Sequence, residues 1–273
     1  MLKTPNMRVY ILDNGWLECD QNWMVAMSTL GTKDNPTPSA NWIKIPVYAV
    51  LIDHPEGKIL YDTGCHPNAM NGYWPDGLQR VFPYYHDESQ TLINQLALVD
   101  TKPEDINTVV LSHMHLDHAG NIGLFQHADV YVPKMDFEFG QTLVHLSSNP
   151  NDHGAYVKAD MDVYAKKYHL VWKDQELVEG ITMLMLPGHT PGLIGLVVNL
   201  KNEGTLIFPQ DAIYTQINYG PPAKASGLLY DSLAFFSSIE KVRELAKKHK
   251  GKVMFSHDMD FFQTLKLAPE YYD

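Results

Sequence analysis

The sequence predicts an α/β protein in which strands and helices are layered around a large core. Three observations lead to this prediction. Short apolar runs of strand length recur along the chain, and segments with helical spacing lie between and after them. The 273 residues, 45% of them hydrophobic, are enough for a well-buried interior. Because no repeat, low-complexity segment or linker divides the chain, we expect a single domain over residues 1–273.

A β-hairpin is expected early in the chain. The apolar runs 47–52 and 58–62 flank His54-Pro55-Glu56-Gly57, whose proline and glycine are typical of a turn. Before the hairpin, Val9-Tyr10-Ile11-Leu12 also has the composition of a strand. Further strands are predicted at 108–111, 130–132, 169–172, 182–186, 193–199, 205–208 and 252–255.

Three helices are predicted among these strands. One covers residues 89–98, and a short one opens at Pro103, where two acidic residues follow the proline as they do at helix N-termini. The clearest helix begins near Asp231, continues with apolar residues at three- and four-residue spacing, and is stopped by Gly251. Asp231 is better explained as the N-cap of this helix than as a catalytic acid.

Three long segments have no predicted helix or strand: 19–44, 65–87 and 214–230. All three are rich in aromatic residues, Met, Pro and Gly. Loops of this length are either disordered or functional, and this apolar content argues against disorder. We therefore expect them to form the walls of a substrate pocket.

Charge and composition exclude several classes of partner. A net charge of −11 does not suit binding to nucleic acid or to an anionic membrane surface. No apolar run approaches the roughly 20 residues of a membrane span. The N-terminus has no signal-peptide pattern, so a cytoplasmic location is expected. Cys19 and Cys65 cannot form a disulfide framework and are expected to be free thiols.

The strongest functional signal is the segment 112–118, in which three histidines and one aspartate follow the apolar run 108–111. Such groups are costly to bury unless they share a ligand, and a metal ion is the usual one. Neighbouring residues rarely complete a coordination shell, so more ligands are expected at other strand ends. His189 in a turn of Pro and Gly, Asp211 and His257 each follow a predicted strand. Alone, each would be read as structural; beside the histidine cluster, metal binding is favoured.

These motifs together resemble the metallo-β-lactamase superfamily. The matching parts are His-x-His-x-Asp-His at 113–118, Pro-Gly-His-Thr-Pro-Gly at 187–192, Asp211 and Ser256-His257. The resemblance implies a four-layer αββα sandwich, with two mixed sheets face to face, helices outside, and metal ions at one edge. Asp62 stands where the family has a strand-end aspartate that supports the metal loop.

The resemblance also implies a centre of two divalent ions, most simply Zn²⁺, with Fe, Mn and Co suiting the same ligand types. The implied ligands of the first ion are His113, His115 and His189, those of the second are Asp117, His118 and His257, and Asp211 bridges the two. In relatives a small residue often precedes the bridging aspartate, whereas Gln210 here is larger.

Within the superfamily, the sequence resembles the N-acyl-homoserine lactone lactonases, the quorum-quenching branch. This likeness extends through 45–48, the hairpin, the metal motif, 211–214 and the tail 256–273. It implies a hydrolase that opens a small-molecule lactone ring through a hydroxide held between the two ions. Tyr214 would donate a hydrogen bond to the lactone carbonyl, and Asp117 would accept a proton and return it to the leaving alkoxide.

For a lactonase, apolar loop residues would form a groove for the acyl chain. The candidates are Trp23, Met24, Met27, Trp42, Tyr73, Trp74, Phe82, Tyr84 and Tyr85. Methionine adapts to acyl chains of different length. The alternative is that these residues pin loops to the domain or bury a subunit interface. Whether the chain is a monomer or a homodimer stays open.

Other functions stay open as well. A different lactone or ester, such as a pyridoxolactone-like ring, would need a cationic anchor, for which Arg80 or Lys224 could serve. A glyoxalase-II-like thioesterase is expected to carry a basic, helical C-terminal extension, whereas only 16 residues follow His257. A structural zinc site or a metal sensor is disfavoured, because structural zinc sites are closed and four-coordinate.

Overall fold

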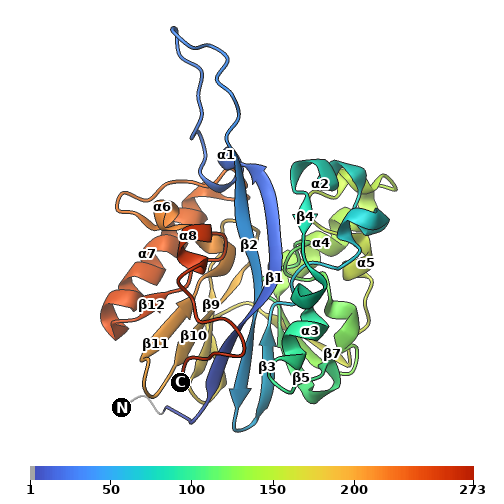
Figure 1. Cartoon of the computed structure of the whole chain (residues 1–273), viewed down its shortest axis with the longest axis vertical. Helices are drawn as coiled ribbons and strands as arrows, with labels where there is room; N and C mark the ends of the chain where they lie inside the picture. Colours follow the sequence, from blue (N-terminus) through green and yellow to red (C-terminus); the bar gives the residue numbers. More distant parts are fainter. Residues whose placement is uncertain (1–3) are drawn as a thin grey trace.

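Two β-sheets lie face to face with helices on their outer sides (Figure 1). The computed structural model describes residues 4–273, so the first three residues of the N-terminal segment, where no signal peptide is expected, lie outside it. The first sheet contains, in spatial order, β4 (Tyr84–Tyr85), β1 (Arg8–Asp20), β2 (Trp42–His54), β3 (Gly57–Tyr61), β5 (Ile106–Val110), β6 (Asp129–Pro133) and β7 (Lys167–Val171). The second contains β12 (Lys252–Val253), β11 (Thr205–Phe208), β10 (Ile194–Asn199), β9 (Ile181–Met185) and β8 (Gln175–Val178).

Both sheets are mixed, as the predicted αββα sandwich requires. In the first, β1, β2, β3 and β4 pair antiparallel, while β3, β5, β6 and β7 run parallel. In the second, only β11 and β12 are parallel. The core between the sheets contains Val9, Ile11, Val50 and Ile52 from one side, and Met183, Ile194, Leu196 and Phe208 from the other. The predicted four-layer fold is confirmed.

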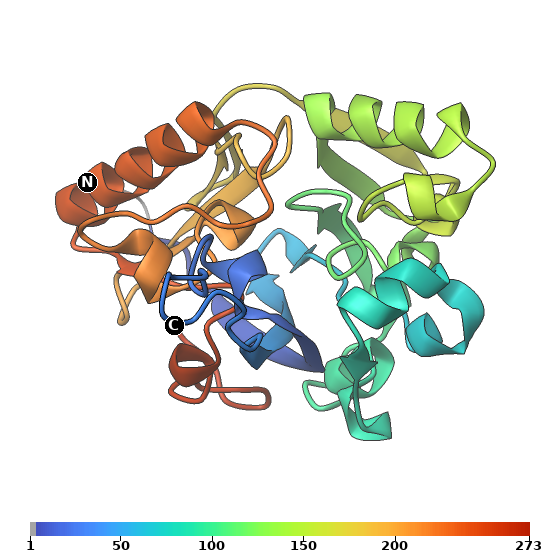
Figure 2. The same cartoon turned by 90° about the horizontal axis from the view of Figure 1, so that it is seen from above.

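Helices cover the outer face of each sheet (Figure 2). α7 (Ser232–His249) packs Phe235, Ile239 and Val242 against the second sheet, and α3 (Leu92–Ala97) and α4 (Lys134–Leu146) cover the first. Shorter helices are α1 (Gln21–Met24), α2 (Asp76–Val81), α5 (Lys158–Met161), α6 (Gln216–Tyr219) and α8 (Met259–Phe262). 3₁₀ turns lie at Glu88–Gln90, Pro103–Asp105, Ile122–Phe125, Pro150–Asp152 and Gln210–Ala212, and a π-helical turn at Ala69–Tyr73.

The predicted hairpin is confirmed, but β1 and β2 are longer than expected. They extend until Cys19 pairs with Ile43 and Asp20 with Trp42, so the expected loop at 19–44 was wrong at both ends. The Asn-Gly at 14–15 looks like a break in β1 but forms a bulge, where Gly15 takes a φ of +85°. Beyond α1 the chain projects from the sheets as an extended loop (Figure 1).

Several helix boundaries also differ from the prediction. Asp231 caps α7 as expected, accepting from the amides of Leu233 and Ala234 at 2.9 and 3.0 Å. Lys250, rather than Gly251, takes the left-handed conformation that ends this helix. The helix expected at 89–98 breaks at Thr91 into a 3₁₀ turn and α3. α4 and β8 were not predicted, and the expected strand 252–255 shortens to two residues.

Two predictions about chemistry and membranes can be compared with the structure. Cys19 and Cys65 are buried free thiols, as expected. From residue 4 onward, no helix combines the length and apolarity needed to cross a bilayer. The single domain, the cytoplasmic location and the monomeric or dimeric state stay predictions.

Candidate metal centre

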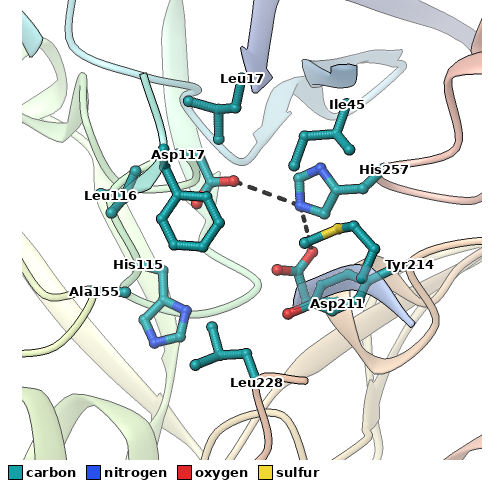
Figure 3. A pocket seen from close by; sticks show the side chains of 12 residues that line it. Leu17, Ile45, His115, Leu116, Asp117, Ala155, Asp211, Tyr214, Leu228 and His257 are labelled. Carbon is teal, nitrogen blue, oxygen red and sulfur yellow. Dashed lines mark ion pairs between the residues drawn. The ribbon is translucent and has the colours of Figure 1, made fainter. Parts of the chain in front are cut away.

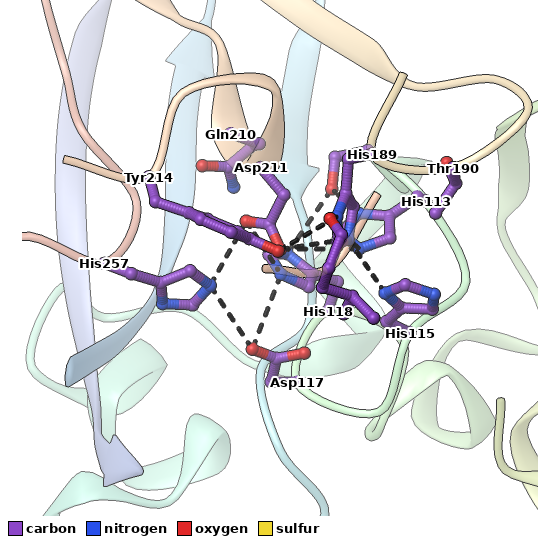
Figure 4. Close-up of polar contacts among 12 residues, drawn as sticks. His113, His115, Asp117, His118, His189, Thr190, Gln210, Asp211, Tyr214 and His257 are labelled. Carbon is purple, nitrogen blue, oxygen red and sulfur yellow. Dashed lines mark hydrogen bonds and ion pairs between the residues drawn. The ribbon is translucent and has the colours of Figure 1, made fainter. Parts of the chain in front are cut away.

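The seven residues expected as metal ligands lie together where strands of both sheets end (Figure 4). Four of them lie on the loop that follows β5, His189 lies in the turn after β9, Asp211 in the 3₁₀ turn after β11, and His257 after β12. None of the seven is more than 8% exposed. The fold therefore brings polar side chains from four segments into one buried cluster.

The first set of side chains is His113, His115 and His189. His189 Nε2 lies 3.2 Å from His113 Nε2 and 3.0 Å from His115 Nδ1. An ion bound at about 2.0–2.1 Å by tetrahedrally arranged nitrogens would separate them by about 3.3 Å. The three ring nitrogens thus face a common point at the spacing that an ion requires.

The second set is Asp117, His118 and His257. The Asp117 Oδ2 atom lies 3.6 Å from His118 Nε2 and 3.5 Å from His257 Nε2. His118 Nε2 is buried and has no hydrogen-bond partner in the protein. A buried nitrogen left in this state is costly, so this atom indicates a missing ligand.

Asp211 lies between the two sets and offers one oxygen to each. Its Oδ2 atom is 3.6 Å from His113 Nε2 and 3.4 Å from His189 Nε2. Its Oδ1 atom is 3.4 Å from His118 Nε2 and 3.2 Å from His257 Nε2, and it also lacks a hydrogen-bond partner. This is the position that a carboxylate bridging two cations would occupy.

The electrostatics of the cluster suit cations. Burial lowers the pKa values of His113 and His115 well below the usual range, and the neighbouring histidines lower them further. Neutral imidazoles are the form that binds metal. Burial raises the pKa of Asp211, but His257 and His118 outweigh burial and hold it well below its usual value. Burial also lowers the pKa of His189, so the first set consists of neutral nitrogens. In the second set, burial is outweighed by Asp117 and Asp211, which raise the pKa values of His118 and His257.

Most of these imidazoles are held at their other ring nitrogen. His257 Nδ1 lies 3.0 Å from the Pro46 carbonyl, His189 Nδ1 lies 3.2 Å from the Leu228 carbonyl, and His118 Nδ1 lies 2.8 Å from Asp62 Oδ2. Asp62 therefore lies where the sequence predicts, against the metal loop. Such contacts fix the tautomer and orient the free nitrogen toward the cluster.

Gln210 fits the site although it is larger than the residue expected there. Its backbone takes a left-handed φ of +46°, and its buried side-chain amide donates to Asp62. The carboxylate of Asp62 also accepts from the Ser112 amide at 2.6 Å and from the Ser112 hydroxyl at 2.9 Å. Gln210 thus links the segment of Asp211 to the support of His118.

Tyr214 lies beside the cluster as predicted. Its hydroxyl is 2.9 Å from His189 Nδ1, and its ring lies 5.4 Å from that of His189 and 5.3 Å from that of His257. Burial, with Asp211 and Asp117 nearby, raises the pKa of the phenol well above its usual value. Two residues that the sequence analysis did not single out, Asp136 and Tyr156, contact the loop behind His115.

A small cavity of about 30 Å³ opens onto the cluster (Figure 3). Its polar wall contains His115, Asp117, Asp211, Tyr214 and His257, and its apolar wall contains Leu17, Met24, Ile45, Phe82, Leu116, Ala155 and Leu228. An apolar hollow of about 310 Å³ shares Phe82, Ala155 and Leu228 with this cavity and adds Trp23, Leu78 and Val81. The two spaces therefore meet at three shared side chains.

The residues expected to form the acyl-chain groove lie in different parts of the structure. Met24 lines the cavity, Trp23 lines the hollow, and Phe82 lines both. Trp74 and Tyr84 are buried in the core instead, so assigning them to the groove was wrong. Met27 and Trp42 are 70% and 50% exposed, Tyr85 stacks on Trp16, and Tyr73 donates to Asp160.

The two basic residues considered as anchors for an anionic substrate lie elsewhere. Arg80 and Lys224 are exposed, and neither lines the cavity or the hollow. The described walls of both spaces contain no lysine or arginine. Neither space therefore offers a flat aromatic acid a lysine or arginine as partner.

Comparisons with known proteins agree with this fold and cluster. Residues 42–219 match the sequence model of the metallo-beta-lactamase superfamily. The chain belongs to this superfamily. Its relatives include the N-acyl homoserine lactonase AiiB of Rhizobium rhizogenes, which is 35% identical over 94% of this chain and 96% of AiiB. An N-acyl homoserine lactonase of Bacillus sp is 31% identical over 84% of this chain and 88% of that protein.

A solved structure is similar to this one over nearly the whole chain. It is an N-acyl homoserine lactone hydrolase with the product N-hexanoyl-L-homoserine bound at its catalytic metal centre. The TM-score is 0.82 at 26% identity, covering 99% of this chain and 100% of that one. The resemblance to the lactonase branch is confirmed.

Proposed function

We propose that this chain is a dinuclear-metal hydrolase that opens the lactone ring of N-acyl-homoserine lactones. The observation that carries the proposal is Asp211, which lines the small cavity and whose two oxygens face two separate sets of ligand atoms. Relatives similar over nearly the whole chain are named for this reaction. A similar structure holds the ring-opened product at its metal centre.

The metal ions would be held by the two sets that Asp211 joins, with zinc as the proposed element. The unpartnered atoms His118 Nε2 and Asp211 Oδ1 fit this role. When bound, such ions polarise a carbonyl and lower the pKa of water toward about 7, so that a nucleophile is available near neutral pH. Imidazole and carboxylate ligands suit zinc well.

Asp117 is the proposed proton carrier. Its side chain lines the cavity beside His115 and His257, so it can reach both the attacking water and the ring oxygen of a lactone. It would take the proton released as water adds to the carbonyl carbon. It would then return that proton to the alkoxide that leaves when the ring C–O bond breaks.

Tyr214 is the proposed donor to the lactone carbonyl oxygen. Because His189 turns Nε2 toward the cluster, its proton resides on Nδ1, which lies 2.9 Å from the Tyr214 oxygen and 3.2 Å from the Leu228 carbonyl, and is shared between these two acceptors. The phenol then accepts from His189 and keeps its own O–H free for the substrate. A donor aimed at the oxygen on which negative charge develops lowers the barrier most.

The direct test is hydrolysis of N-hexanoyl-homoserine lactone by zinc- or cobalt-loaded protein, followed by proton release. We expect kcat/KM above about 10⁴ M⁻¹s⁻¹, ordinary for an enzyme on its own substrate. A background rate with two ions bound would reject this substrate and keep the dinuclear hydrolase. An open-chain thioester, measured in parallel, tests the thioesterase alternative.

We infer that the acyl chain lies in the apolar hollow beyond Phe82. Trp23, Leu78 and Val81 line that space, and no described lysine or arginine does. Replacing Leu78 with Trp would fill the hollow, so kcat/KM for a decanoyl lactone should fall about 10-fold or more while a butanoyl lactone is unaffected. Leu98→Trp, at a half-exposed site outside the hollow, is the control. An equal loss for both lactones would contradict this placement.

A pyridoxolactone-like substrate is less favoured, because Arg80 and Lys224 are exposed and line neither space. A thioesterase of the glyoxalase II kind is also less favoured, because relatives similar over nearly the whole chain are named for lactone hydrolysis.

A further inference from the structure

Behind the first set of ligands lies a buried carboxylate that the proposed reaction does not use. Asp136 is 0% exposed and lies in the first turn of α4, directly after β6. Its Oδ2 atom accepts from the Met114 amide at 2.8 Å, and its Oδ1 atom accepts from the Tyr156 hydroxyl at 2.5 Å. Thr190 also interacts with this carboxylate.

Each of these contacts leads to a ligand of the first set. Met114 lies between His113 and His115 in the chain, and Thr190 follows His189. The ring of Tyr156 packs edge-on against that of His115, with centroids 4.7 Å apart and planes at 75°. One carboxylate therefore joins the two segments that supply the first set and the loop of Tyr156 that packs against His115.

His115 depends most on this support. The other ring nitrogen of His113 contacts the Ser112 hydroxyl at 3.0 Å, and that of His189 contacts the Leu228 carbonyl. Over residues 4–273, the hydrogen bonds of the structure include none at His115 Nε2. The loop amide of Met114 and the ring of Tyr156 are thus what hold this imidazole.

A glycine on α4 leaves room for the Tyr156 ring that packs against His115. Gly140, one turn after Asp136 on α4, faces the Tyr156 ring, and a Cβ atom there would lie only 2.6 Å from Tyr156 Cδ1. The loop of Tyr156 is also fixed to the metal loop, because the Leu116 amide donates to the Ala155 carbonyl at 3.0 Å. A side chain at position 140 would push Tyr156 out of its place.

The structure assigns Asp136 and Tyr156 as positioning residues that hold His115 for the first metal ion. This inference rests on the proposed dinuclear centre. An acidic residue in a first helical turn can stabilise a helix on its own. Here, however, the hydrogen bonds of both carboxylate oxygens go to residues outside α4, so the contacts serve the loop.

The test compares four variants by metal binding rather than by activity. In Asp136→Ala we expect one of the two ions to bind about 10–100-fold more weakly, the usual effect of removing support from a ligand. Tyr156→Phe keeps the ring and should lose less. Asp136→Asn should recover most of the affinity, since its carbonyl can accept from Met114 and its amide can donate to the Tyr156 oxygen. Glu138→Gln, exposed on the same helix, is the control.

Chelator titration of each protein, with the visible spectrum of the cobalt form, gives the affinity and geometry of each ion. Unchanged affinities in Asp136→Ala, with only a lower unfolding temperature of the metal-free protein, would overturn the inference. If Asp136→Ala does not fold, unchanged binding in Tyr156→Phe overturns it instead. A wild-type protein that binds fewer than two ions would reject the dinuclear centre itself, a separate and recognisable failure.

Discussion

The two halves of the candidate metal centre are each supported by one buried carboxylate, but in different ways. Asp62, at the end of β3, contacts the ligand His118 directly and reaches His113 through the Ser112 hydroxyl. Asp136, on α4, contacts no ligand and acts on the neighbours of His115. One carboxylate orients imidazoles by hydrogen bonds, and the other fixes the segments that carry them.

The partners of the two carboxylates differ in chemistry as well. At Asp62 the partners include a backbone amide, the Gln210 side-chain amide and the His118 ring, groups that here act as donors. At Asp136 one partner is the Tyr156 hydroxyl, which can either donate or accept. The same substitution of Asp by Asn should therefore be severe at one position and mild at the other.

The largest effect is expected at Asp211, which belongs to both halves. Asp211→Ala removes both carboxylate oxygens, of which Oδ2 faces the first set and Oδ1 the second. It should therefore abolish binding of both ions, and with it all hydrolysis. Metal content after gel filtration, together with the ring-opening rate, measures this. Asp260→Asn, exposed on α8, is the control. A variant that keeps two ions would remove Asp211 from the ligand set.

A large effect on catalysis without loss of metal is expected at Tyr214, on the first half. Tyr214→Phe removes the hydroxyl beside His189 but keeps the buried ring, so kcat/KM should fall by about 10–10³-fold while metal content stays at wild type. Steady-state kinetics on loaded protein provide the measurement. Unchanged kinetics would exclude Tyr214 from the mechanism.

The comparison itself is tested at Asp62. In Asp62→Asn the new amide nitrogen would face a hydrogen-bond donor, so the affinity for the second ion should fall about 10–100-fold. The affinity for the first ion should fall less, because Asp62 reaches His113 only through the Ser112 hydroxyl. Asp136→Asn should change either affinity little. Chelator titrations of the two variants, carried out side by side, measure both metal affinities. Equal effects would show that both carboxylates act alike.

The sequence predicts the Asp62 half of this arrangement better than the Asp136 half. Asp62 was expected because a known family pattern contains it. Asp136 also follows a buried strand, β6, but it lies in the first turn of a helix that was itself not predicted. Without that helix, nothing in the sequence places Asp136 behind His115. Tyr156 is harder still, since only the packed structure brings its ring against the imidazole.

The loops show the same limit of sequence reasoning. Aromatic residues in a long loop predict burial, but not which surface they are buried against. Trp74 and Tyr84 pack into the core, whereas Trp23 and Phe82 line the spaces beside the metal centre. In the fold, β1 continues through a bulge near Gly15, well beyond the strand-like run 9–12 that the sequence predicts.

A third buried carboxylate, Asp160, gives the smallest expected effect on the site and sharpens the contrast. It accepts from the Tyr73 hydroxyl at 2.5 Å, its other oxygen has no partner, and it contacts none of the ligands. Burial raises its pKa to about 7. Asp160→Asn should therefore leave both metal affinities unchanged, unlike Asp62→Asn.

The same variant should instead change how stability depends on pH. Between about pH 4, the ordinary pKa of an aspartate, and pH 7, the unfolded chain loses the Asp160 proton while the folded chain keeps it. As the pH rises across this range, Asp160 therefore lowers the free energy of unfolding of the wild type. Asp160→Asn has no ionisable group at this position, so its stability lacks this decrease. Denaturant unfolding of the metal-free proteins at pH 5 and pH 8 measures the difference, which should grow in favour of the variant toward pH 8. A difference in the free energy of unfolding that does not change with pH would mean that the buried Asp160 ionises at its ordinary pKa.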